Sequence, residues 1–169
     1  YSNQRFIDET IKNESEQARK ALIFIEARMA EVENDLIEKK DDLKKFQENN
    51  KTVDVDLQIQ SIIDSLMVID TKLSEIDIEI ERAKSSFTES NPLFVNLINQ
   101  KGALLEQQQA IQESVQDLPF AQQKFIDLYR ELETTQEIFN QLQARKLEFS
   151  LKEASTLGNI RIIDNFKLY

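Results

Sequence analysis

The side chains that most often do chemistry in proteins are scarce in this chain. It contains no His and no Cys, which removes the usual nucleophile–base pairs and the commonest metal ligands. The carboxylates are spread along helical patterns, where a solvated helix surface explains them. No phosphate-binding loop, dinucleotide-binding glycine pattern or Gly-x-Ser-x-Gly motif occurs. We therefore expect no catalytic residue, no cofactor-binding residue and no metal ligand in this chain.

Two polar stretches raise the possibility of ligand binding. Asp54 and Asp56 alternate with valines, but the Gly and the closing Glu of a calcium loop are missing at the required spacing. The stretch NQKGALLEQQQAIQES, residues 99–114, is rich in amides that can hydrogen-bond sugar hydroxyls. A polar helix face is the simpler interpretation of these glutamines.

Composition narrows the class of protein. The 169 residues include only two Gly and two Pro, which favours long uninterrupted helices. A formal net charge of −10 disfavours nucleic acid as a partner, because a polyanion would be repelled. No apolar run is long enough to cross a membrane. The chain begins at Tyr1 without Met, so we expect it to be a piece of a longer protein.

Apolar residues spaced alternately three and four apart recur in four segments. This is the heptad pattern of helices that pack along a seam. The predicted helices span about residues 4–48, 57–86, 91–117 and 120–155. The seam of the third helix contains Lys101 and Gln108, and polar seam residues of this kind fix the register between helices.

Local sequence marks where two of these helices begin. Ser90 or Asn91 can cap the third helix, and Pro92 fits its first turn, where a missing N–H costs nothing. Pro119 pushes Leu118 out of the α region, so a break or a kink is expected there. Pro119 opening the fourth helix is the alternative. Asn91, Pro92 and Pro119 are therefore predicted to be structural residues.

The C-terminal end differs from the rest of the chain. Gly158 is a good helix stop, and the Ile-rich run after it, through Phe166, is typical of a strand. The predicted fold class is all-α, an elongated antiparallel helical bundle or coiled coil with one short C-terminal β-strand. A lone strand leaves its backbone N–H and C=O groups unpaired, so it needs partner strands.

The C-terminal half, from Leu118 to Asp164, resembles the extracytoplasmic region of polysaccharide co-polymerases. These are the chain-length determinant proteins of the Wzz and Wzc type. The resemblance rests on a Leu-Pro-x-x-Gln-Gln element, an Arg near the start of a long helix, and a Gly-Asn-Ile-Arg-Ile-Ile-Asp run. In this sequence those residues are Leu118, Pro119, Gln122, Gln123, Arg130 and Gly158 to Asp164. Earlier segments, including the Asn-Pro element at Asn91, resemble the family more loosely.

The resemblance implies a role without catalysis by this segment. Members have two membrane spans that flank a periplasmic region, placed on the periplasmic side of the bacterial inner membrane. The resemblance implies that this region combines a long helical protrusion, here residues 1–156, with a membrane-proximal α/β base. Residues 157–169 would be the terminal strand of that base, incomplete here, and its other strands would precede Tyr1. Their subunits form homo-oligomeric rings that control the length or export of a surface polysaccharide or exopolysaccharide. Expected partners are the polysaccharide polymerase, an outer-membrane export protein and the growing glycan. Some members carry a cytoplasmic tyrosine kinase domain, and the Asn-Pro element resembles that branch or the exopolysaccharide branch.

Four residues are candidates for oligomer or partner contacts. Gln122 and Gln123 either touch glycan or a neighbouring subunit, or cap and solvate a helix start. Arg130 is expected to pair with an acidic residue across helices, and Arg161 with a carboxylate of the base. Two other functions stay open: a helical-hairpin adaptor of an envelope secretion or efflux system, and an intracellular coiled-coil tether.

Overall fold

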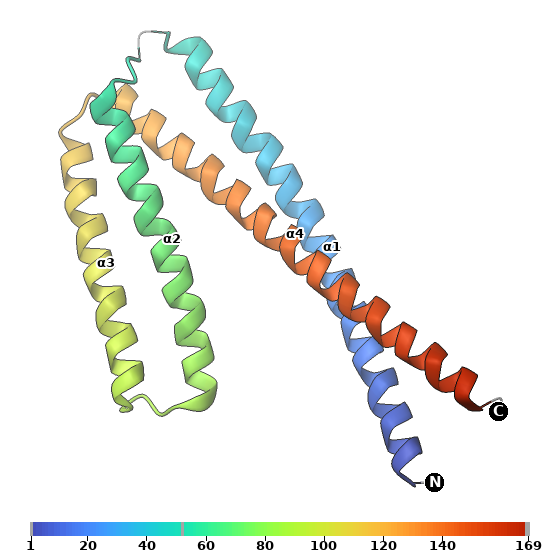
Figure 1. Ribbon diagram of the computed structural model, residues 1–169. Helices are drawn as coiled ribbons and strands as arrows, with labels where there is room; N and C mark the ends of the chain where they lie inside the picture. Colours follow the sequence, from blue (N-terminus) through green and yellow to red (C-terminus); the bar gives the residue numbers. More distant parts are fainter. Residues whose placement is uncertain (1, 52, 168–169) are drawn as a thin grey trace. The chain divides into compact units, whose positions relative to one another are not determined.

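The computed structural model describes residues 2–51 and 53–167, and this part of the chain consists of helices and their connections (Figure 1). The helices are α1 (Ser2–Asn49), α2 (Leu57–Ser86), α3 (Pro92–Gln116) and α4 (Phe120–Lys167). The predicted all-α class is confirmed. Heptad-spaced apolar residues explain it, because each helix can bury its stripe only against another helix.

The chain divides into two compact units. One, the two-helix unit, consists of Tyr1–Glu38 and Thr134–Tyr169, and so combines most of α1 with most of α4. The other, the hairpin unit, is Lys39–Glu133 and contains α2, α3, the end of α1 and the start of α4. Each unit has buried side chains of its own.

The main core of the hairpin unit is formed by side chains from four helices. Leu66 of α2 is completely buried, and Ile63 and Ile126 are each only 1% exposed. Removing such side chains from water is the largest favourable contribution to folding, at about 1.5–3 kcal/mol for each one fully buried. The buried members of this cluster are Leu43, Ile59, Ile63, Leu66, Val115, Phe125, Ile126 and Leu128.

Helices α2 and α3 form an antiparallel hairpin whose outer half has a second core (Figure 1). Ile76, Ile80 and Ala83 of α2 pack with Phe94 of α3. Side chains fix the start of both helices. Asp56 caps α2 by accepting the Ile59 N–H at 2.9 Å, and Asn91 caps α3 by accepting the Leu93 N–H at 2.9 Å. Pro92 occupies the first turn of α3, where no N–H donor is needed.

In the two-helix unit, α1 and α4 pack along the predicted seam. Ala18, Ile25 and Val32 of α1 lie seven residues apart and are all buried, as is Thr156 of α4. An ion pair joins Lys146 Nζ to a Glu26 carboxylate oxygen at 3.7 Å. The seven-residue repeat of buried side chains is typical of helices that pack in the coiled-coil manner.

The predicted C-terminal strand is wrong. Helix α4 continues through Gly158 to Lys167, and no strand occurs among residues 2–51 and 53–167. Gly158 does not have a positive φ, so it is an ordinary helical residue and does not stop the helix. Residues 168 and 169, the end of the predicted strand segment 157–169, lie outside the described residues.

The physical reason is backbone hydrogen bonding. A helix pairs each N–H with a carbonyl four residues earlier, whereas a strand depends on a neighbouring strand. The described residues provide no such neighbour. The helix penalty of the Ile residues is only a few tenths of a kcal/mol each, which is far less than the cost of unpaired backbone groups.

Candidate functional site

The most connected polar group in the hairpin unit is the carboxylate of Asp70, on α2. Arg130 of α4 donates to both of its oxygens, with N–O distances of 2.9, 3.0 and 3.2 Å. Gln108 of α3 donates its side-chain amide to the same carboxylate at 2.9 Å. We call Asp70, Gln108 and Arg130 the Asp70 network. It joins three helices through one acceptor group.

The Asp70 network is partly shielded from water. The side chains of Arg130 and Asp70 are 17% and 26% exposed, whereas those of Lys101 and Asp77 in a neighbouring ion pair are 36% and 54% exposed. A two-pronged Arg–carboxylate contact is both stronger and more directional than a single ion pair. Because three helices converge on Asp70, the network fixes the register of α4 against the hairpin. Among the described residues, every buried side-chain nitrogen or oxygen atom has a hydrogen-bond partner.

A second polar pair lies one heptad away from the first on both hairpin helices. Lys101 of α3 pairs with Asp77 of α2 at 2.7 Å. Lys101 and Gln108 are seven residues apart in the α3 seam, and Asp70 and Asp77 are seven apart on α2. The heptad pattern predicted the two α3 residues as polar seam positions but did not identify Asp70 and Asp77, although the two aspartates have the same seven-residue spacing.

Both glutamines of the Leu-Pro-x-x-Gln-Gln element hydrogen-bond within the chain. Gln123 donates its side-chain amide to the carbonyls of Leu118 at 2.7 Å and of Gln116 at 3.1 Å. These carbonyls lie at and just past the end of α3, so Gln123 satisfies groups that the helix leaves open. Gln122 donates to the Asp54 carbonyl at 3.3 Å, in the α1–α2 connection. The Pro119 carbonyl accepts the backbone N–H groups of both glutamines. In this arrangement the amides hold the connection before α4.

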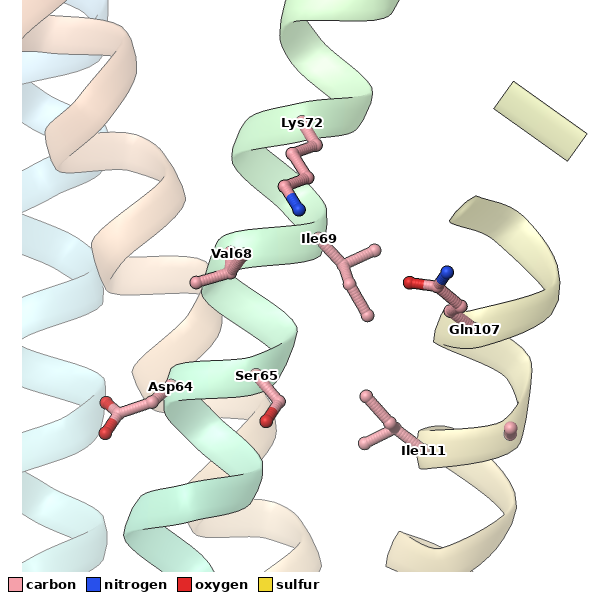
Figure 2. Close-up of a pocket in the computed structure, with 8 residues that line it drawn as sticks. Asp64, Ser65, Val68, Ile69, Lys72, Gln107 and Ile111 are labelled. Atoms are coloured by element: carbon pink, nitrogen blue, oxygen red, sulfur yellow. The ribbon is translucent and has the colours of Figure 1, made fainter. Parts of the chain in front are cut away.

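One face of the hairpin is an open groove of about 550 Å³ between α2 and α3. Figure 2 shows Ile69 of α2 and Ile111 of α3 pointing toward each other, with Lys72 and Gln107 nearby. The groove has an apolar floor with polar groups at its sides. Amides and charged groups placed in this way can hydrogen-bond a polar chain or a helix laid along the groove.

The remaining site candidate, Arg161, lies on α4 and is exposed. Arg161 belongs to the two-helix unit, whereas Gln122, Gln123 and Arg130 belong to the hairpin unit.

The pKa of one tyrosine in the hairpin unit is shifted from its ordinary value. Burial, followed by the charges of Glu133 and Asp64, raises the pKa of Tyr129, whose ring stacks on Phe125 at 6.0 Å.

The described residues contain no group of three or more His, Cys, Asp or Glu side chains able to hold a metal ion. Across the same residues, none of the helices combines the length and the hydrophobicity that a membrane span needs.

Comparison with known sequences adds evidence about ancestry. The family GNVR, described as "G-rich domain on putative tyrosine kinase", matches residues 121–168. That range covers nearly all of α4, including Gly158 and Arg161. The tyrosine-protein kinase wzc of Salmonella typhimurium is 29% identical over 161 residues, which is 95% of this chain and 22% of the kinase.

These matches confirm the resemblance of this chain to polysaccharide co-polymerases of the Wzz and Wzc type. Two further relatives are more distant in sequence. The tyrosine-protein kinase etk of Escherichia coli is 23% identical over 159 residues, and the tyrosine-protein kinase ptk of Acinetobacter johnsonii is 22% identical over 159. Each match covers 94% of this chain and 22% of the relative. The chain thus spans about a fifth of the length of these Wzc-type relatives.

Proposed function

We propose that this chain is the helical part of an oligomeric scaffold in a polysaccharide co-polymerase, on the periplasmic side of the bacterial inner membrane. The scaffold controls the chain length or the export of a surface polysaccharide or exopolysaccharide. The observation that carries the proposal is the alignment of 95% of this chain with a Wzc-type relative, together with the GNVR match on α4.

The side chains are consistent with a role that needs geometry more than chemistry. The polar groups with the most hydrogen bonds between helices and connections, the Asp70 network and Gln123, hold helices in register. On this proposal the longer protein oligomerises and positions the polymerase, an outer-membrane export protein and the growing glycan. Because the relatives are named tyrosine-protein kinases, we also propose that a kinase domain lies elsewhere in the longer protein.

The test is deletion of the gene, with the polysaccharide then sized by gel electrophoresis and the full-length protein sized by native mass spectrometry in detergent. We expect loss of polymer or an altered length distribution, restored by the wild-type gene, and an oligomeric full-length protein. Normal polymer in the deletion strain together with a strictly monomeric protein would overturn the proposal. Normal polymer with loss of another exported substrate would favour the secretion or efflux adaptor.

A further inference from the structure

The groove between α2 and α3 continues beyond the hollow shown in Figure 2. A second open hollow of about 380 Å³ adjoins the first, and Lys72 of α2 and Gln107 of α3 line both. Along α2 the two hollows extend from Asp64 to Glu79, a length of about 22 Å at the helical rise per residue. We call the two hollows together the hairpin groove. It is long enough to hold several units of an extended polymer.

The α3 wall of the hairpin groove is polar but uncharged. Amide and alanine side chains alternate along it, in the order Gln100, Ala103, Gln107 and Ala110. The spacing of three, four and three residues keeps them on one face of the helix. The charged residues of α3 line neither hollow. The small alanines let a ligand come close to the helix between one amide and the next.

The α2 wall carries the charged groups of the hairpin groove. Asp64, Glu75 and Glu79 contribute three carboxylates and Lys72 one ammonium, so the groove has a net charge of −2. A polyanion is repelled by such a surface, whereas an uncharged chain is not. The charge of the groove therefore favours a neutral ligand over an acidic one.

The polar groups of the groove are not used by the fold. Among the described residues, the side chains of Gln100, Gln107 and Lys72 make no hydrogen bond or ion pair with another residue. In contrast, the adjacent Gln108 donates to Asp70, and Gln123 donates to carbonyls at the end of α3. The groove thus presents donors and acceptors that are available to a ligand.

A chain of sugars suits this mixture better than a protein helix does. A hydroxyl both donates and accepts, so it can pair with an amide, an ammonium or a carboxylate. The C–H groups of a sugar ring can rest on the apolar floor, where Ile69 and Ile76 are buried. A helix would have to lay an apolar stripe on that floor, which would bury Lys72 and Glu75 without partners at a cost in free energy.

We infer that the hairpin groove binds an uncharged, hydroxyl-rich segment of a polysaccharide. The inference rests on the proposed function and adds to it a binding site and a class of sugar. Because the groove is open, each subunit holds the glycan weakly. Several copies of the groove on one oligomer would strengthen the hold on a long chain.

Titration of the full-length protein in lipid nanodiscs tests the binding. The probes are short oligosaccharides cut from the polysaccharide that the producing strain exports, and oligogalacturonate of similar length as a polyanion. Saturation-transfer NMR measures the two affinities. We expect the exported-polysaccharide fragments to bind, and oligogalacturonate to bind at least about tenfold more weakly because its carboxylates are repelled. No binding of the fragments, or equal binding of the two probes, would overturn the inference.

Alanine variants show whether the binding uses the hairpin groove. Gln100→Ala with Gln107→Ala removes both amides of the α3 wall and should weaken binding of the fragments about tenfold. Helical circular dichroism should be unchanged, because Ala is a better helix former than Gln. The matched control is Gln109→Ala with Gln116→Ala, two exposed amides of α3 outside the groove, which should leave the affinity unchanged. Equal effects of the two double variants would contradict the inference.

A cysteine on the α3 wall shows what covers the groove in the membrane. The chain contains no Cys, so Ala103→Cys can be labelled alone in a full-length protein otherwise free of cysteine. In membranes of a strain that makes no polysaccharide, we expect a water-soluble maleimide to label Ala103→Cys, and added fragments to slow the labelling. A cysteine that is already protected without sugar would show that a protein segment covers the groove, and the inference would be wrong.

The outcomes separate this inference from the proposed function. If deletion of the gene alters the polymer but the fragments do not bind, the inference is wrong and the scaffold stands. Normal polymer in the deletion strain overturns the proposed function and, with it, the inference.

Discussion

Arg130 of α4 and Asp70 of α2, sixty residues apart in sequence, form a two-pronged ion pair in which both carboxylate oxygens accept. Gln108 of α3 shares the same carboxylate. Arg130 was one of the residues singled out from the family resemblance, and its contact in this chain is within the fold. A role for Arg130 between subunits stays a prediction.

Replacing Asp70 by Ala should destabilise the hairpin unit by about 1–3 kcal/mol, because Arg130 and Gln108 lose their shared acceptor in a partly buried place. Chemical denaturation monitored by circular dichroism measures the free energy of unfolding. The matched control is Asp77→Ala, which removes an ion pair whose carboxylate is 54% exposed and should cost under about 1 kcal/mol. Equal losses for the two variants would show that the Asp70 network has no special weight.

Leu66→Ala should be among the most damaging single changes in the chain. The side chain is fully buried in the main core of the hairpin unit, so its truncation leaves a cavity that costs about 2–5 kcal/mol. Val68→Ala, two residues further along α2, serves as the control because Val68 is 53% exposed and should shift the free energy of unfolding by under about 0.5 kcal/mol. A small effect of Leu66→Ala would contradict the described core.

Gly158→Ala distinguishes the observed helix from the helix stop expected from sequence. A Cβ at Gly158 meets no atom within 4 Å, so Ala should fit and raise helix stability by about 1 kcal/mol. Gly102→Ala, inside α3 and equally unobstructed, should behave in the same way. Circular dichroism and denaturation report the change. A Gly158→Ala protein that loses helix and stability would indicate a left-handed conformation at this position instead.

Alkaline pH should destabilise the hairpin unit through Tyr129. The fold raises the pKa of this phenol above the ordinary 10.0, mainly by burial, so the folded state prefers the neutral form. This contribution to stability is complete below pH 10 and is lost as the pH rises from there through the higher folded-state pKa. Unfolding measured from pH 8 to 12 should show a steeper fall for the wild type than for Tyr129→Phe. Parallel curves would exclude this role.

Particular residues show how far sequence reasoning reached. The heptad stripe on α1 predicted a helix whose buried side is now seen at Ile25 and Val32. Lys101 and Gln108 were predicted to be polar seam residues that fix the register between helices, but periodicity could not name their partners, Asp70 and Asp77. Those pairs depend on the relative height of α2 and α3, which is a property of the packed hairpin.

The terminal strand shows the opposite case. Local preferences at Gly158 and the Ile residues after it favoured a stop and a strand, whereas in the structure α4 continues as a helix that satisfies its own backbone. Local propensities amount to tenths of a kcal/mol per residue, and unpaired backbone groups cost several times more.

The sequence by itself determined the predominantly helical class, the seams and the family resemblance, because periodicity, the scarcity of Gly and Pro, and short motifs are all local properties. Only the tertiary structure decided what those residues touch. It placed Arg130 and Gln108 on Asp70, and Gln123 on the end of α3. It also left Ile23 and Ile37 of α1 and Leu147 and Leu151 of α4 exposed. Each of these depends on which helix lies against which, and at what height.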